Sequence, residues 1–359
     1  MMALPVMVLQ GCSTIAYYAQ AVHGHLEMIG QARPVELVER DPATPARLRE
    51  RLALAREIRE FASRALGLPD NGSYRRYADI GRPYVVWNVI STPEFSAEPF
   101  EHCFPVAGCV GYLGYYAEAA ARSAAAREAA LGRDAYVGGV PAYSTLGWFD
   151  DPLLSTFVFQ PDVELARLVF HELAHQVAYV KDDTVFNESF ASVVEEEGVR
   201  RWLEQREAAA APPANAAKPA GPAASAATAA FEQYRAARVR RQALTTLLMD
   251  YRERLRGMYA ASADDAARRS AKAAQFAALA ADYARLKASW GGFAGYDRLF
   301  AGGANNALLA SVAAYNELVP AFSAVLEAQQ RDLPAFYKVV RELAALPPAE
   351  RRRRLSALR

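Results

Sequence analysis

Apolar residues recur along the first half of the chain at spacings that predict both helices and strands. Steps of three and four over residues 34–66 and 162–180 are typical of amphipathic helices. Residues 84–90 are rich in β-branched and aromatic side chains and form the clearest predicted strand. Shorter strands are expected over residues 104–113 and 136–140. This half should therefore combine helices with a small sheet.

The second half of the chain is expected to be helical. Apolar stripes over residues 244–258 and 276–290 are typical of a long helical hairpin packed on a core, or of a coiled-coil arm. Residues 207–230 are almost all Ala with four prolines, and this composition predicts an exposed linker or loop. The expected fold is α+β and mostly α, with residues 13–206 before the linker and a helical region, 231–359, that packs on them.

The amino-acid composition argues against a disordered chain and against a nucleic-acid-binding protein. Hydrophobic residues make up 52% of the 359 positions, which argues against general disorder. The formal net charge of +1 gives no reason to expect a nucleic-acid partner. The basic run at residues 351–354 is expected to be a solvated helix face or tail, with contact to anionic lipid headgroups as the alternative.

The stretch from His171 to His175 reads H-E-x-x-H. Two imidazoles four residues apart on a helix lie on one face, so both can bind one metal ion. Glu172 beside them can hold a water molecule on the metal. The chain has only five His, and chance would produce this motif in roughly fewer than one such chain in a hundred. The alternative is a pair of hydrogen-bonded histidines on a buried helix.

A third ligand is expected from the helix that follows. Glu188 lies in the first turn of an apolar pattern that runs from Asn187 to Leu203, and it is the favoured carboxylate. The competing carboxylates are Glu195, Glu196, Glu197, Asp182 and Asp183, and the last two are expected to be solvated turn residues. Two His, one carboxylate and a position left for water are typical of a catalytic zinc site, with one zinc ion per chain.

Residues 187–195 resemble the third-ligand helix of aminopeptidase N-type enzymes, which are gluzincin metallopeptidases with the motif N-E-G-F-A. The chain also resembles a family of bacterial lipoprotein aminopeptidases. This resemblance spans most of the chain and includes residues 136–152 and 305–315. The resemblance implies a zincin-like catalytic core, a peptide substrate and an aminopeptidase activity. The chain departs from aminopeptidase N-type enzymes in two respects. Fewer residues separate His175 from Glu188, and residues 137–144 lack the acid that binds the substrate amine.

The expected mechanism is attack of zinc-bound water on the peptide carbonyl. Glu172 would accept the proton of that water and pass it to the leaving amine. Related peptidases stabilise the oxyanion with a Tyr or His from a later helix. No His follows His175, so Tyr315 is the candidate donor, and a core aromatic is the alternative interpretation.

Substrate contacts are expected at two places before the metal helix. Gly138 and Gly139 follow a short apolar strand, where they would let a peptide backbone pair with the strand edge. An ordinary hairpin or bulge is the alternative there. Asp150 or Asp151 could hold the amino group of a substrate.

The N-terminus resembles a bacterial lipoprotein signal. Leu9-Gln10-Gly11-Cys12 resembles a lipobox, so residues 1–12 are expected to form a signal segment with lipid attached to Cys12. Residues 1–5 contain no Lys or Arg, and a short buried segment is the alternative. Ser13 resembles residues that permit sorting to the outer membrane, so a periplasmic, membrane-anchored protein is expected.

The remaining two cysteines, Cys103 and Cys109, could form a small disulfide loop in an oxidising periplasm. Two buried free thiols are the alternative. Two other functions compete with the aminopeptidase. One is a periplasmic zinc amidase or endopeptidase that acts on an amide such as a cell-wall peptide. The other is a lipoprotein scaffold without catalysis.

Overall fold

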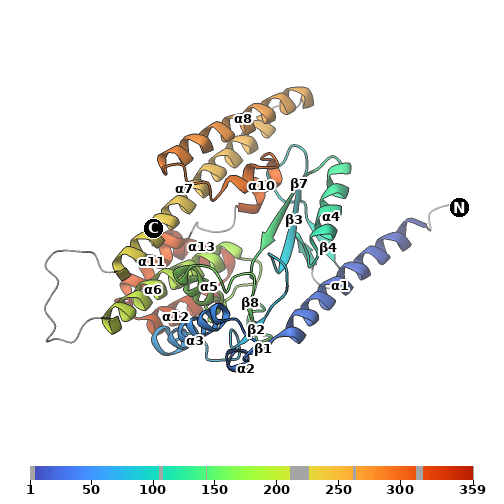
Figure 1. The fold of residues 1–359 in the computed structure, drawn as a ribbon. Coiled ribbons are helices and arrows are strands. Elements are labelled where there is room, and N and C mark those ends of the chain that lie inside the picture. Colours follow the sequence, from blue (N-terminus) through green and yellow to red (C-terminus); the bar gives the residue numbers. More distant parts are fainter. Residues whose placement is uncertain are drawn as a thin grey trace. The chain divides into compact units, whose positions relative to one another are not determined.

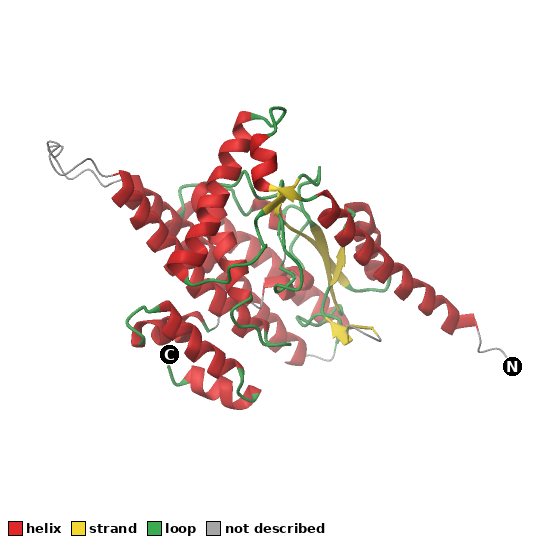
Figure 2. Cartoon of the chain, turned by 90° about the horizontal axis from the view of Figure 1, so that it is seen from below, coloured by secondary structure: helices red, strands yellow, loops and turns green. Residues whose placement is uncertain are grey.

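The computed structural model describes residues 5–104, 108–142, 144–210, 226–261, 264–312 and 318–358. It is a mostly helical α+β structure with small sheets (Figure 2). The helices are α1 (Pro5–Gln31), α2 (Val35–Arg40), α3 (Ala46–Leu66), α4 (Glu118–Ala130), α5 (Asp162–His175), α6 (Thr184–Ala210), α7 (Ala226–Ala261), α8 (Asp265–Ser289), α9 (Asp297–Phe300), α10 (Asn306–Val312), α11 (Val319–Ala328), α12 (Leu333–Ala344) and α13 (Pro348–Ser356). The strands are β1 (Arg33–Pro34), β2 (Arg76–Ala78), β3 (Val86–Thr92), β4 (His102–Phe104), β5 (Gly108–Val110), β6 (Leu113–Tyr115), β7 (Asp134–Val140) and β8 (Leu153–Leu154).

Two expected elements are divided in the structure. The single helix predicted over residues 34–66 is two helices, α2 and α3, because Pro42 and Pro45 lie between them and Pro45 caps α3. The strand predicted over residues 104–113 is replaced by the short strands β5 and β6, with Gly111 between them. The expected linker, 207–230, is helical at both described ends, and its residues 211–225 lie outside the described ranges.

The residues form two compact units, and each unit is built from three separate segments. The first unit contains Met1–Gly30, Arg82–Ala142 and Arg240–Ala313, and the second contains Gln31–Gly81, Tyr143–Val239 and Ala314–Arg359. Each region expected from the sequence is one continuous stretch, whereas the segments of the two units alternate along the chain. Segments far apart in sequence therefore meet within each unit.

The first unit is organised around an antiparallel sheet with the strand order β6-β3-β7. Strands β3 and β7 are labelled in Figure 1. Side chains of β3 alternate between its faces, as expected for a strand. Trp87 and Val89 pack with Ala121 and Ala124 of α4, whereas Ile90 packs with Ala307 of α10. Both faces of the sheet are therefore covered by helices of the same unit.

The two apolar stripes expected in the second half of the chain lie on α7 and α8. They meet in one apolar cluster of buried residues, Leu244, Leu248, Tyr251, Leu255, Tyr259, Leu279, Tyr283 and Leu309. Tyr251 also donates a hydrogen bond to Asp282 at 2.7 Å. None of the described helices is both long and apolar enough to cross a membrane.

The second unit joins a small sheet, β1-β2-β8, to a group of packed helices. Helix α5 packs against α3 and α6, with the rings of Phe61 and Phe170 5.8 Å apart. On the other side of α6, Phe190 packs with Phe322 of α11 and Phe336 of α12. Helices α5 and α6, which carry the H-E-x-x-H motif and Glu188, are thus held in the core of this unit.

Glu197 on α6 is a fully buried carboxylate surrounded by arginines. It accepts hydrogen bonds from Arg200 at 2.7 Å, Arg201 at 2.6 Å and Arg331 at 3.1 Å. Burial opposes its ionisation, but the hydrogen bonds from the arginines outweigh burial and lower the pKa of Glu197 to about 2. The ionised form therefore stabilises the contact between α6 and the segment that joins α11 to α12.

Replacing Glu197 by Gln should lower the free energy of unfolding near pH 7 by about 3 kcal/mol, since one pKa unit is worth about 1.4 kcal/mol. A carboxyl with a lowered folded-state pKa stabilises above its ordinary pKa of 4.5, and the contribution is lost as the pH falls toward 2. Urea titrations over this range measure the difference between the two proteins. A difference that stays constant down to about pH 2.5 would contradict the assignment. The control is Glu204→Gln, at an exposed partner of Arg200.

Arg351 corrects the expectation of a solvated basic run at residues 351–354. Its side chain is buried and donates to Asp183 at 2.8 Å and 3.0 Å. Asp183 is likewise more than a solvated turn residue, because it also accepts a hydrogen bond from the backbone of Phe186 in the first turn of α6. Residues 352–354 are exposed, as expected.

Candidate metal centre

The H-E-x-x-H motif lies at the C-terminal end of α5, not in the middle of a longer helix as the sequence suggested. The helix ends at His175, and Gln176 is its C-cap. The connection to α6 is then held by the buried Asn187, whose side chain accepts from Val180 N and donates to Val180 O, both at 2.8 Å. This pair of hydrogen bonds fixes the turn between the two helices and so the place of Glu188, the next residue.

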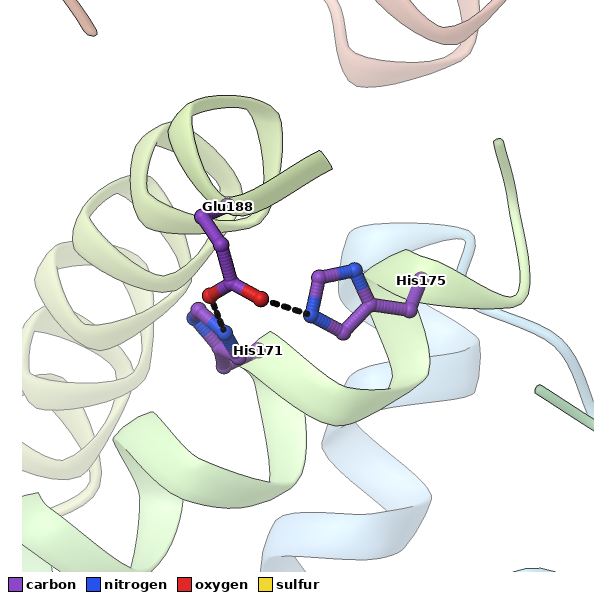
Figure 3. Close-up of side chains that lie close together, drawn as sticks. All are labelled: His171, His175 and Glu188. Carbon is purple, nitrogen blue, oxygen red and sulfur yellow. Dashed lines mark hydrogen bonds and ion pairs between the residues drawn. The ribbon is translucent and has the colours of Figure 1, made fainter. Parts of the chain in front are cut away.

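His171, His175 and Glu188 come together as expected. Their ligand atoms all lie within 4.8 Å of one another. The carboxylate of Glu188 extends from α6 between the two imidazoles of α5, with one oxygen 3.2 Å from Nε2 of His171 and the other 3.7 Å from Nε2 of His175 (Figure 3). Helix α6 begins at Thr184, so Glu188 lies one turn inside it and not in its first turn. This group could hold a metal ion.

Glu195 has a role that the sequence did not reveal. It is one of the carboxylates that compete with Glu188 in the sequence, but its oxygen accepts a hydrogen bond from Nδ1 of His171 at 2.9 Å, on the side of the ring away from Glu188. Arg167 donates to the same oxygen at 2.9 Å and also to Glu164 at 2.8 Å. A carboxylate on the second nitrogen orients a metal-binding His and raises its basicity. The spacing of seven residues from Glu188, which places both on one face of α6, is the signal that could have found it.

The electrostatics of the two histidines differ. Burial lowers the pKa of His171, but the hydrogen bonds to Glu188 and Glu195 outweigh burial and raise that pKa to about 10. Burial and the neighbouring His171 lower the pKa of His175 to about 4, so its imidazole is neutral at pH 7. Nδ1 of His175 is buried and has no hydrogen-bond partner among the described residues. Metal binding would release the proton that His171 holds in the metal-free group, and two neutral imidazoles with a carboxylate oxygen form a donor set that fits zinc.

Glu172 is half-buried beside the group. Burial raises its pKa to about 7, with His171 acting in the opposite direction and the carboxylates of Glu188 and Asp151 raising it further. A carboxylate whose pKa lies near neutrality can both accept and return a proton at physiological pH. Glu172 is therefore suited to move a proton at this site.

Tyr74 and Asp151 also interact electrostatically with Glu172, and this proximity was not predicted from the sequence. Tyr74 is buried in a left-handed backbone conformation, with φ of 62°. Its hydroxyl has no hydrogen-bond partner within the described part of the chain. Burial raises the pKa of Tyr74 well above its ordinary value, and Glu172 and Asp151 raise it further. The backbone N–H of Tyr74 donates to the carbonyl of Asp151 at 2.6 Å.

The acids proposed for substrate binding differ in burial. Asp151 is buried, and its carboxylate accepts from Thr145 N at 2.9 Å and from Ser144 Oγ at 3.3 Å. Asp150 is exposed, and its side chain fills the space that a Cβ on Gly72 would occupy. Of the two, Asp151 is the one whose charge raises the pKa of Glu172.

The two glycines proposed for substrate binding lie on β7 in the first unit. Gly138 pairs with Asn88 and Gly139 with Trp87, and β7 is an edge strand of the sheet as described. A Cβ on Gly139 would lie 2.3 Å from the ring of Tyr84. Close packing against Tyr84 is therefore sufficient to require that glycine.

The remaining predicted residues fall outside the second unit or outside the described residues. Tyr315 lies in residues 313–317, which are not described. Cys12 lies within α1. Cys103 and Cys109 are joined by a disulfide between the paired strands β4 and β5.

Comparisons with known proteins agree with the coarser part of the sequence interpretation. No curated protein and no solved structure matches the chain. One family model, Aminopep, described as "Putative aminopeptidase", matches residues 16–355 and so covers nearly the whole sequence. The chain therefore belongs to this aminopeptidase family.

Proposed function

We propose that the protein is a zinc-dependent metallopeptidase that acts as an aminopeptidase. The observation that carries the proposal is the convergence of His171, His175 and Glu188 beside the half-buried Glu172, in a member of an aminopeptidase family. Two imidazoles and one carboxylate leave coordination positions for water and substrate, as catalytic zinc sites do. A bound zinc ion supplies polarisation of the peptide carbonyl and acidification of water.

The residues of the chain supply the proton transfers. Glu172 accepts the proton of the attacking water and returns it to the amine that leaves. Its pKa of about 7 keeps both protonation states accessible at neutral pH. Glu195, itself held by Arg167, fixes the ring of His171 so that Nε2 faces the centre. Tyr315 remains our candidate for a donor to the oxyanion.

We also propose that the protein is attached to a bacterial membrane by lipid on Cys12 and faces the periplasm, at the outer membrane. The lipobox-like run from Leu9 to Cys12 supports the anchor. The disulfide between Cys103 and Cys109 supports an oxidising compartment, where such bonds persist.

The substrate class is tested with matched reporters whose amino terminus is either free or acetylated. An aminopeptidase should hydrolyse the free leucine reporter at least about 100-fold faster, because acetylation removes the charge that the enzyme must recognise. The ratio of kcat/KM for the two reporters is the measurement. Activity on acetylated peptides alone would replace the aminopeptidase by an endopeptidase or another amidase. Hydrolysis of neither would favour a scaffold without catalysis.

A further inference from the structure

A tight turn over residues 145–149 follows Ser144 in the second unit. Thr145 Oγ1 accepts from the backbone N–H of Phe149 and donates to its carbonyl, both at 3.1 Å. Trp148 N also donates to Thr145 O at 3.1 Å. The buried carboxylate of Asp151 fixes the start of the turn through Thr145 N at 2.9 Å. Several hydrogen bonds therefore hold the turn in one conformation.

This fixed turn presents aromatic side chains to solvent. Trp148 is 85% exposed and Phe149 is 50% exposed. A large aromatic ring gains much free energy from burial, so an ordered turn that exposes two of them is suited to cover an apolar group of a ligand. Trp is enriched among the residues that dominate binding, so an exposed Trp on an ordered turn is a candidate contact for a ligand.

The turn lies beside the metal centre. A Cβ on Gly147 would be 3.5 Å from the side chain of Gln176, the residue after His175. Gln176 is four residues from Glu172, so the turn contacts the same side of the helix as Glu172. Asp151, at the end of this segment, acts electrostatically on Glu172.

A further aromatic ring lies close to the second metal ligand. Tyr179 is half exposed, and its ring centroid is 6.3 Å from that of His175. Exposed aromatic surface therefore lies on the connection after α5 as well as on the turn.

We infer that the turn over residues 145–149, with Trp148 at its tip, binds a bulky apolar side chain of the peptide substrate next to the cleaved bond. This inference rests on the proposed function, because continuity with the metal centre identifies the occupant as substrate. A membrane surface fits the turn less well. Residues 144–151 contain no Lys or Arg and include the exposed Asp150, whereas segments that bind anionic bilayers are basic.

The test compares Trp148→Ala with the wild type on aminoacyl reporters that carry Phe, Leu, Ala or Gly. We expect kcat/KM to fall about tenfold for Phe and Leu, mainly through KM, and less than about twofold for Ala and Gly. Trp148→Phe should restore most of the loss because it keeps an aromatic surface. An equal fall on all four reporters, or no fall on any, would overturn the inference.

Phe159→Ala is the matched control. Phe159 is also an exposed aromatic of the second unit, but it precedes α5, and its ring packs under the guanidinium of Arg47 at 4.8 Å. The 14 residues of α5 place His175 about 20 Å from that end of the helix. This variant should keep the substrate profile of the wild type. A loss of selectivity equal to that of Trp148→Ala would show that the effect is not specific to the turn.

A binding measurement separates this inference from the proposed function. Calorimetric titration of zinc-loaded Glu172→Gln with phenylalaninamide and alaninamide does not depend on turnover. Tighter binding of phenylalaninamide, lost when Trp148→Ala is added, supports the inference even if the wild type hydrolyses no reporter. Equal binding of the two amides overturns it, whatever the activity. A Trp148→Ala protein that binds phenylalaninamide normally but loses binding to vesicles of anionic phospholipid would assign the turn to the membrane instead.

Discussion

Replacing Glu172 by Gln is expected to lower kcat on a free leucine reporter by about 1,000-fold while the metal content stays at about one ion per chain. The amide has nearly the shape of the carboxylate but cannot accept the proton of the attacking water. Glu172 is not among the three residues whose ligand atoms converge, so the metal group should remain intact. Steady-state kinetics and metal analysis on the same preparation measure both outcomes.

Asp162→Asn is the control for this variant. Asp162 lies on α5 as well, but it is the first residue of the helix and pairs with Arg51. The control should keep both activity and metal. A Glu172→Gln protein that hydrolyses the reporter at the wild-type rate would remove Glu172 from the mechanism. One that loses its metal would instead make Glu172 a residue of the metal group.

Glu188→Ala is expected to weaken zinc binding by at least about 100-fold, and the activity should fall with it. The substitution removes the carboxylate that lies between His171 and His175 (Figure 3). It leaves the pair of hydrogen bonds between Asn187 and Val180, so α6 should keep its position. Competition with a chromophoric chelator measures the affinity, and circular dichroism checks the fold.

Two variants on the same helix give the comparison for Glu188→Ala. Glu195→Gln keeps all three candidate ligands and removes the charge of the carboxylate shared by His171 Nδ1 and Arg167, so the zinc affinity should fall by about 10- to 100-fold. Glu204→Ala, at an exposed residue of α6, should leave the affinity unchanged. Zinc affinity unaltered by Glu188→Ala would show that another carboxylate completes the group.

The metal group could be predicted from the sequence because its members are close in the chain. The spacing of His171 and His175 places them on one face of a helix, and Glu188 follows within the next helix. The prolines at 42 and 45 should equally have predicted two helices where one was expected. Residue spacing was sufficient to predict the metal group, and the two prolines would have been sufficient to predict the break between α2 and α3.

Other features could not be predicted because they depend on segments that meet only in the folded chain. Tyr74 and Asp151 reach Glu172 from segments about 100 and about 20 residues earlier in the sequence. Arg351 pairs with Asp183 across 168 residues, although its neighbours 352–354 are solvated. Hydrophobic periodicity shows which face of an element is buried but not which element packs against it, so an ion pair between distant segments carries no local signal.

The most direct test of the account is hydrolysis of a free leucine reporter before and after metal removal. Dialysis against a chelator should reduce the rate to less than about 1% of the starting value. About one equivalent of zinc per chain should restore it, and Glu188→Ala should not recover at the same zinc concentration. A rate that persists in metal-free protein would contradict the central claim that peptide hydrolysis occurs at a zinc ion held by His171, His175 and Glu188.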